Sequence, residues 1–186
     1  MKQENILKNL LKVGLLSIVL CIGLIFYNIA NYTVQKYQAK YNSQTGVPYE
    51  ISMHNRLNEL ECLTKNIYYE AGSEPFEGKV AVAQVTLNRV QSRSFPKSIC
   101  GVVYQKNKFY EKIVCQFSWY CESPSKLKVV NRGLYNESKD VAEKVLFENY
   151  RLRSLEQAIY YHADYINPGW KKPRITKIGH HIFYRG

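Results

Sequence analysis

Residues 67–90 read IYYEAGSEPFEGKVAVAQVTLNRV, and this stretch decides the fold class of the domain that contains it. Before this stretch and into its first residues, apolar or small residues recur at steps of three and four, as on one face of an amphipathic helix. These residues are Leu57, Leu60, Thr64, Ile67 and Ala71. Gly72 is a typical helix stop. Ser73, Glu74 and Pro75 then offer an N-cap residue, an early acidic residue and an early proline. The stretch therefore predicts one helix ending near residue 72 and another over about residues 74–90.

The segment that follows predicts less regular structure. Residues 92–96 break the second helix, and Ser98 is a candidate cap for a short helix that runs to about Tyr104. Residues 105–133 are irregular in pattern, and residues 138–147 predict a third helix.

The C-terminal part of the chain predicts strands. Residues 158–162 and 175–184 are rich in β-branched and aromatic residues, with turn signals at Pro168-Gly169 and Ile178-Gly179. Helices first and strands last predict an α+β domain.

The N-terminal region predicts a single membrane-spanning helix. Residues 13–30 form an apolar run that only Ser17 and Asn28 interrupt, and such a run is just long enough to cross a hydrocarbon core. Three lysines precede it, so the positive-inside rule leaves the N-terminus in the cytoplasm and exports everything after Tyr32. A cleaved signal peptide is the alternative, although the run exceeds a usual signal core and no A-x-A-like site follows. Leu20 before Cys21 argues against a lipoprotein cleavage site.

These features divide the chain into three parts. We expect a cytoplasmic stub and anchor over residues 1–32, a polar linker over residues 33–49 and a catalytic domain over residues 50–186. The linker is rich in polar residues and ends in Gly46-Val47-Pro48, so we expect it to behave as a coil that tethers the domain near the membrane. The predicted location is the cytoplasmic membrane, single-pass, with the domain in the periplasm or outside the cell.

The net charge of +11 predicts an anionic partner. Nucleic acid, an anionic lipid surface and an anionic cell-wall polymer all fit this charge. Export of the domain excludes nucleic acid, because the basic domain then lies on the wrong side of the membrane.

Cysteine usage agrees with export. Cys21 lies in the apolar run, which leaves Cys62, Cys100, Cys115 and Cys121 for the domain. Four cysteines in an exported domain predict two disulfides, with three possible connectivities. A four-thiolate zinc site is the alternative, disfavoured by wide spacings and the lack of a C-x-x-C pair.

Glu70 is the first candidate for chemistry. It stands at the predicted end of a helix, where the helix dipole disfavours a carboxylate, and Tyr68 and Tyr69 add surface of low polarity. Both effects raise the pKa of a carboxyl group, and a protonated carboxylic acid can donate its proton to a glycosidic oxygen. On these grounds alone, a solvated glutamate at a helix end is the plainer interpretation. Glu74 suits a structural role at the next helix start, whereas Glu77 fits either role.

Aromatic residues and histidines supply the other candidates. The chain holds 16 tyrosines, more than one core needs, and such rings can stack on sugars while hydrogen-bonding at their edges. Residues placed to line a glycan groove are Trp119, Tyr120, Tyr160, Tyr161, Trp170 and Tyr184. His162, Asp164, His180 and His181 raise the alternative of a zinc amidase that cuts the peptide stem. Two features argue against it: the sequence has no H-E-x-x-H motif, and on a strand the adjacent His180 and His181 point to opposite faces, so only one of them could join His162.

Three blocks of the sequence together resemble a known family, the SleB-type cell wall hydrolases. The first block is residues 62–63 and 67–90; the second is residues 95–96, 99–105 and 115–118; the third is residues 161–162, Pro168, Trp170 and 178–184. The resemblance covers about residues 60–185. Gly72-Ser73 stands where the family commonly has Arg-Gly, and Glu122-Ser123 replaces a pair common in relatives, so fine substrate preference is open.

The resemblance implies a lysozyme-like α+β domain that cleaves peptidoglycan between N-acetylmuramic acid and N-acetylglucosamine, as a lytic transglycosylase or a muramidase. It places the catalytic acid on Glu70, which overturns the plainer interpretation above. In a lytic transglycosylase one glutamate serves as acid and then as base, which agrees with the lack of a clear second carboxylate. We expect substrate contacts from Glu77, Gln116, Ser118, Tyr161, His162, Trp170, His181 and Tyr184. We expect no metal or other cofactor; a zinc amidase and a non-catalytic wall-binding protein remain alternatives.

Overall fold

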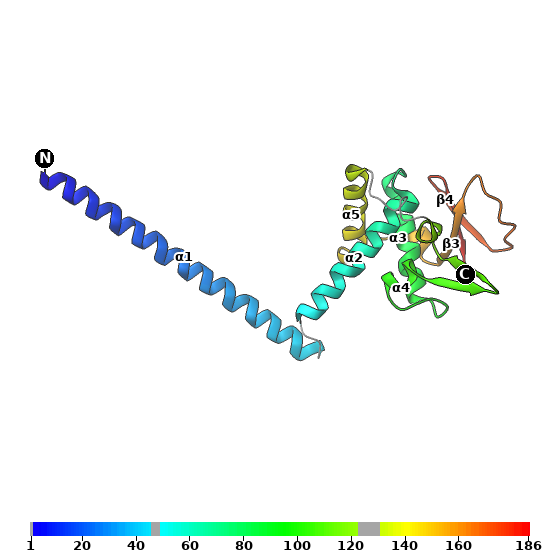
Figure 1. The fold of residues 1–186 in the computed structure, drawn as a ribbon, viewed down its shortest axis with the longest axis horizontal. Helices are drawn as coiled ribbons and strands as arrows, with labels where there is room; N and C mark the ends of the chain where they lie inside the picture. The colour runs from blue at the N-terminus through cyan, green and yellow to red at the C-terminus, as the bar shows by residue number, and fades with distance from the viewer. Residues whose placement is uncertain (1, 46–48, 123–130) are drawn as a thin grey trace. The chain divides into compact units, whose positions relative to one another are not determined.

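The computed structural model describes residues 2–45, 49–122 and 131–186, and the chain falls into two compact units (Figure 1). The first unit is Met1–His54 and the second is Asn55–Gly186. Each is described by itself below.

The first unit contains the long helix α1, Lys2–Thr45. Its segment Leu11–Lys40 is long and apolar enough to cross a membrane, by length and composition, as a membrane anchor or a signal sequence is. The coil expected from residue 33 onward is wrong as far as Thr45, which is helical. The chain has no glycine or proline between Asn31 and Thr45, so nothing stops the helical hydrogen bonding. Gly46 to Pro48 lie outside the described residues, and the division into anchor, linker and domain stays a prediction.

The second unit is built on α3 and on the part of α2 from Asn55 onward, two helices that the sequence predicts. Helix α2, Tyr49–Ala71, ends where Gly72 donates its N–H to the carbonyl of Tyr68 (3.1 Å). Helix α3, Phe76–Gln91, starts two residues later than expected, with Pro75 at its N-cap and no side-chain cap. Ser73 therefore does not cap it, and the side chain of Glu74 serves another purpose, described below.

Two further α-helices, α4 and α5, are described in the second unit. Helix α4, Ile99–Val103, is capped as predicted by Ser98, whose Oγ accepts from the N–H of Gly101 (3.0 Å). Helix α5, Arg132–Phe147, starts six residues earlier than expected because Asn131 caps it, its Oδ1 accepting from the N–H of Leu134 (3.1 Å).

The strands form two antiparallel sheets. The three-stranded sheet has the order β3-β5-β4, with β3 Ala158–Ala163, β4 Arg174–Ile178 and β5 His181–Arg185. Gly179, with φ of 54°, makes the predicted turn between β4 and β5. A hairpin of β1, Lys106–Phe109, and β2, Lys112–Cys115, lies in the region expected to be irregular. Its strands are only four residues long and rich in lysine, so they lack the run of β-branched and aromatic residues by which a strand is predicted. The 3-10 helices η1, Ser118–Cys121, and η3, Arg153–Leu155, follow β2 and precede β3.

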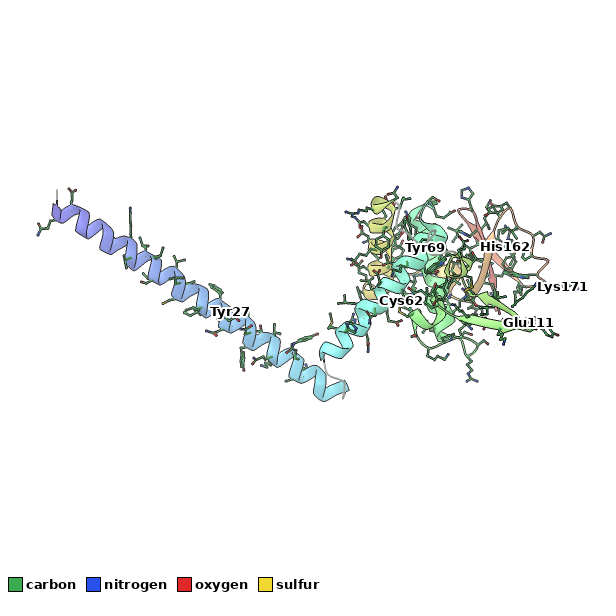
Figure 2. The ribbon with its side chains drawn as sticks, viewed as in Figure 1. Tyr27, Cys62, Tyr69, Glu111, His162 and Lys171 are labelled. Carbon is green, nitrogen blue, oxygen red and sulfur yellow. A yellow bond between two sulfur atoms is a disulfide. The ribbon has the colours of Figure 1, made fainter. Side chains whose placement is uncertain are left out.

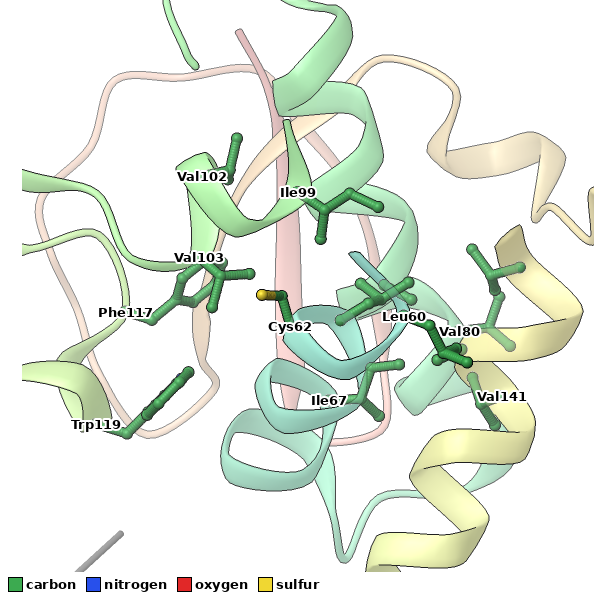
Figure 3. Close-up of a cluster of buried hydrophobic side chains, with 14 residues drawn as sticks. Leu60, Cys62, Ile67, Val80, Ile99, Val102, Val103, Phe117, Trp119 and Val141 are labelled. Atoms are coloured by element: carbon green, nitrogen blue, oxygen red, sulfur yellow. The ribbon is translucent and has the colours of Figure 1, made fainter. Parts of the chain in front are cut away.

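The hydrophobic core lies between α2, α3, α4 and α5 (Figure 3), and Leu63, Ile67, Val80 and Val102 in it are fully buried. A smaller cluster around Phe183 and Leu155 joins α3 to the three-stranded sheet. Both predicted disulfides form, between Cys62 and Cys100 and between Cys115 and Cys121. The first ties α2 to α4, and the second ties β2 to η1. The first disulfide therefore adds a covalent link to the core packing of α2.

Candidate active site

A groove of about 700 Å³ runs along the second unit, between the end of α2, the segment 115–122, and β3 with the loop that follows it. Nine residues expected from the sequence line it: Glu70, Gln116, Ser118, Trp119, Tyr160, Tyr161, His162, Trp170 and His181. Figure 2 labels two of the groove residues, Tyr69 on α2 and His162 on β3. Residues separated by about 90 positions in the sequence are thus brought to one cavity.

Glu70 occupies the last turn of α2, half-buried in the groove. The hydroxyl of Tyr161 donates to Glu70 Oε2 at 2.8 Å. Burial raises the pKa of the Glu70 carboxyl; the hydrogen bond from Tyr161 and the positive charge of Arg89 oppose this rise, and the negative charge of Glu122 adds to it. The net result is a carboxyl group biased toward its protonated form, as a general acid requires.

The neighbouring tyrosines act differently from the expectation. The hydroxyl of Tyr68 accepts from the backbone N–H of Asn131 (3.2 Å), and the ring of Tyr69 stacks on Trp119 with 4.7 Å between ring centroids. The pKa of Glu70 is raised because the carboxyl group is buried in the groove, beside Tyr161 and Arg89.

Arg89 is the main residue that sequence reasoning missed. It is only 4% exposed, and its Nε donates to the carbonyl of Ile159 (2.9 Å). Its guanidinium lies over the rings of Phe117 (5.1 Å) and Tyr161 (5.8 Å), and Nη1 has no hydrogen-bond partner among the described residues. Burial lowers the pKa of Arg89, and the negative charge of an ionised Glu70 opposes this fall. The only feature of the sequence that points to Arg89 is its positive charge in a helix whose other residues are mostly small or apolar.

Tyr161 and His181 complete the centre of the groove. Burial and the negative charge of Glu70 raise the pKa of Tyr161, so its hydroxyl stays protonated and donates. His181, 8% exposed, meets Tyr161 edge-on at 5.1 Å between ring centroids, and its Nδ1 has no partner among the described residues. Burial lowers the pKa of His181, which favours a neutral ring near pH 7. We call Glu70, Arg89, Tyr161 and His181 the floor of the groove.

The outer residues of the groove are more exposed. Trp170 is 40% exposed and packs edge-on against His162 at 5.5 Å between centroids. His162 Nδ1 faces the carbonyl of Ala163 (2.8 Å), so it donates there, and Nε2 accepts from the hydroxyl of Tyr184 (2.9 Å). Tyr184 therefore orients His162 rather than lining the groove itself. We call Gln116, Ser118, Glu122 and Trp170 the rim of the groove.

Two neighbouring glutamates have other positions. Glu77 is exposed in the first turn of α3 and is not among the residues that line the groove. Glu74 is nearly buried and accepts from the backbone N–H and the Nδ1 of His180 (3.1 and 3.0 Å). A Cβ at Gly179 would lie 1.7 Å from Glu74 Oε2. Glu74 is thus a clamp between the start of α3 and the β4–β5 turn, which sets the position of the adjacent His181.

The histidines do not converge on one point. His180 is held by Glu74 and His162 by Tyr184, while Asp164 forms an ion pair with Lys177 (2.7 Å). Within residues 2–45, 49–122 and 131–186, no group of three or more His, Cys, Asp or Glu residues is placed to hold a metal ion.

Comparison with known proteins places the chain in a family. The cell wall hydrolase family model matches residues 73–184, so the chain belongs to this family. A spore cortex-lytic enzyme of Bacillus cereus is 30% identical over 159 residues, which cover 81% of this chain and 52% of that protein. The spore cortex-lytic enzyme of Bacillus subtilis is 30% identical over 134 residues, covering 68% and 37%. The chain thus spans about half the length, or less, of the curated relatives it matches.

Solved structures agree with this assignment. The catalytic domain of the Bacillus cereus SleB protein matches with a TM-score of 0.51 and 28% identity, over 69% of this chain and 91% of that one. The catalytic domain of the germination-specific lytic transglycosylase SleB from Bacillus anthracis matches with a TM-score of 0.50 and 28% identity, over 69% and 94%. The SleB-type resemblance and the α+β class are therefore confirmed. The family match begins at Ser73, three residues after Glu70, so the role of Glu70 rests on the geometry of the groove.

Proposed function

We propose that this chain is a lytic transglycosylase that cleaves peptidoglycan glycan strands between N-acetylmuramic acid and N-acetylglucosamine, with Glu70 as its acid and base. The observation that carries the proposal is the position of Glu70, a carboxyl group with a raised pKa, in a large groove of a cell wall hydrolase. The family and the SleB neighbours support the substrate class.

The reaction needs one carboxyl group used twice. Protonated Glu70 donates its proton to the glycosidic oxygen, the bond from that oxygen to the muramoyl C1 breaks, and positive charge develops on the sugar ring. The Glu70 carboxylate then removes the proton of the muramoyl 6-hydroxyl while that oxygen attacks C1. An anhydro ring forms, the other strand leaves with a free hydroxyl, and Glu70 is protonated again.

The floor residues assist the second half of this cycle. Once Glu70 has lost its proton, the Tyr161 hydrogen bond and the nearby Arg89 charge stabilise the carboxylate. Their opposing effect on the pKa of Glu70 keeps it able to act as a base as well as an acid. His181 lines the groove with a ring whose neutral form is favoured, and such a ring can exchange a hydrogen bond with a polar group of the sugar.

The rim provides the contacts that hold a glycan strand. Trp170 offers an exposed ring on which a sugar can stack, and Gln116 and Ser118 offer hydrogen-bonding groups beside the groove. Because His162 already bonds to Ala163 and Tyr184, it supports Trp170 by packing. Glu77 lies outside this groove, and the proposal does not use it.

A muramidase is the second candidate, favoured by one observation. Glu122, which the sequence did not single out as a carboxylate partner, lines the same groove as Glu70, and hydrolysis commonly uses a second carboxylate to activate water. Against the muramidase, Glu122 is exposed at the rim. Its carboxylate is therefore solvated, and it lacks the water-excluded surroundings that strengthen a catalytic base.

We further propose that α1 is retained as a single-pass anchor and that the catalytic domain, lysozyme-like in architecture, faces the cell wall. The apolar segment Leu11–Lys40 and the two disulfides indicate an exported domain. Retention of α1 as an anchor would place the enzyme within reach of the wall and make a separate wall-binding repeat unnecessary.

Mass spectrometry of the products tests the reaction type. Purified sacculi are digested with the full chain in detergent, and the released fragments are analysed for their muramoyl ends. Anhydro-muramoyl ends are the expected result. Reducing ends would contradict the transglycosylase and support the muramidase, whereas release of peptides without glycan cleavage would support an amidase.

A further inference from the structure

A second cavity of about 290 Å³ adjoins the groove, and we call it the side pocket. It is lined by Lys65, Tyr69, Tyr104, Trp119 and Tyr120. Tyr69 and Trp119 line the groove as well. Because these two rings stack on each other at 4.7 Å between centroids, the stacked pair forms a wall that the two cavities share.

The side pocket combines aromatic walls with positive charge. Tyr104 and Tyr120 lie 4.7 Å apart between ring centroids, and Lys106 Nζ lies 4.6 Å from the centroid of Tyr120. Burial raises the pKa of Tyr69 and of Tyr104, so both hydroxyls remain protonated near pH 7. A ligand suited to these walls has a small apolar part and a carboxylate that pairs with an ammonium group.

Lys65 is able to bind such a carboxylate at small cost. Its present partner is Glu61, four residues earlier on α2, with 3.2 Å between Nζ and Oε1 and both side chains substantially exposed. Exposed ion pairs of this kind contribute little to stability. Glu61 also accepts from the hydroxyl of Tyr135 (2.9 and 3.0 Å), so it keeps a partner when Lys65 turns toward a ligand.

We propose that the side pocket binds the peptide stem of the muramic acid residue whose glycan strand occupies the groove. A linear strand that follows the groove cannot also occupy a cavity behind the Tyr69–Trp119 wall, whereas a branched polymer can. Peptidoglycan carries its branches as short peptides with methyl groups and free carboxylates. The aromatic walls contact the methyl groups, and Lys65 pairs with a stem carboxylate. The inference rests on the proposed function and adds that the enzyme prefers glycan strands that carry peptide stems.

The test compares two substrates that differ only in the branch. Soluble glycan strands bearing peptide stems, and the same strands stripped of peptides by an amidase, are digested by the full chain in detergent. The native chain is expected to have a higher kcat/KM on the peptide-bearing strands. Lys65→Gln is expected to lower this preference about fivefold through KM, as the loss of one charge-assisted hydrogen bond predicts. Tyr104→Phe, which removes one hydroxyl, is expected to lower it about twofold.

Lys139→Gln is the matched control. Lys139 also pairs with a glutamate four residues away on a helix, Glu143 on α5, and it does not line either cavity. It is expected to keep the native preference. An equal kcat/KM of the native chain on both substrates, or a preference that Lys65→Gln and Tyr104→Phe leave unchanged, overturns the inference while the proposed function stands. No cleavage of either substrate by the native chain overturns the proposed function and the inference with it.

Discussion

The floor and the rim of the groove differ in how much freedom the structure leaves to their side chains. On the floor, Arg89 and His181 are buried, and Glu70 is held by a hydrogen bond from Tyr161. On the rim, Ser118 and Trp170 are exposed. A general acid needs removal from water to keep its proton, whereas a ring that stacks on a sugar needs access to solvent. The difference assigns chemistry to the floor and substrate binding to the rim.

The supports of the two regions differ accordingly. The floor residues come from α2, α3, β3 and β5, which meet at the buried clusters. The rim residues come from the segment 115–122 and from the loop after β3, and the Cys115–Cys121 disulfide fixes the first of these. Changes on the floor should therefore alter kcat, and changes on the rim should alter KM.

The largest expected effect separates the two carboxyl groups of the groove. Glu70→Gln keeps the size of the side chain and removes the transferable proton, so kcat should fall at least about 10³-fold. Glu122→Gln, on the rim, should lower kcat less than about tenfold. Rates of fragment release from sacculi measure both. Comparable large losses in the two variants would mean that both carboxyl groups act in the chemistry, as in a muramidase.

Removal of the floor cation should have the next largest effect. Arg89→Met keeps an apolar stem between the rings but removes the charge that stabilises the Glu70 carboxylate, so kcat should fall about 100-fold. The lost hydrogen bond to Ile159 should also lower the free energy of unfolding by about 1–3 kcal/mol. Steady-state kinetics and urea unfolding give the two values. Arg93→Met, at an exposed arginine beyond α3, is the control, and an equal response in both variants would argue against a role for Arg89.

A rim change should act mainly on binding. Trp170→Ala removes a stacking surface, so KM for soluble glycan strands should rise about tenfold while kcat changes less than about threefold. Tyr110→Ala serves as the control, because Tyr110 is 99% exposed at the hairpin tip and does not line the groove. If Trp170→Ala lowers kcat and leaves KM unchanged, the separation of floor and rim is wrong.

The smallest expected effect concerns the pH profile. The Tyr161 hydrogen bond lowers the pKa of Glu70 against the larger effect of burial. Tyr161→Phe removes it, so the pKa of Glu70 should rise, and the acid form should persist to higher pH. The basic limb of the kcat profile should then move to higher pH, with kcat at neutral pH lowered less than about tenfold because the carboxylate loses a stabilising partner. A basic limb that stays in place or moves to lower pH would contradict the assignment.

The sequence predicts the parts of this molecule that depend on local patterns. Gly72 ends α2, Ser98 caps α4 and Gly179 makes the β4–β5 turn, because each acts within a few residues of its own position. The extent of α1 differs from the prediction because a polar composition indicates coil, although none of the polar residues between Asn31 and Thr45 stops a helix. The start of α5 is earlier than predicted because Asn131, whose capping role the sequence pattern does not indicate, begins the helix.

The site depends more on contacts between distant residues. Glu70 and the groove residues Gln116 and His181 were identified from the family resemblance, but their convergence required the fold. Arg89 escapes prediction because one sequence does not reveal that a helical arginine is buried and interacts electrostatically with Glu70. The disulfide pairing was equally undetermined, since three connectivities suited the four cysteines until the structure brought Cys62 to Cys100 and Cys115 to Cys121.

The central claim is that burial in the groove raises the pKa of the Glu70 carboxyl group above that of an exposed glutamate, against the opposing effects of Tyr161 and Arg89. The most direct measurement is a carbon-13 NMR titration of the glutamate side-chain carboxyl groups in the full chain, with the Glu70 signal assigned by its absence from Glu70→Gln. The account predicts a midpoint for Glu70 above the value of about 4.3 that an unperturbed glutamate has. A midpoint at or below that value would contradict it, because Glu70 would then be ionised near neutral pH and unable to act as the acid.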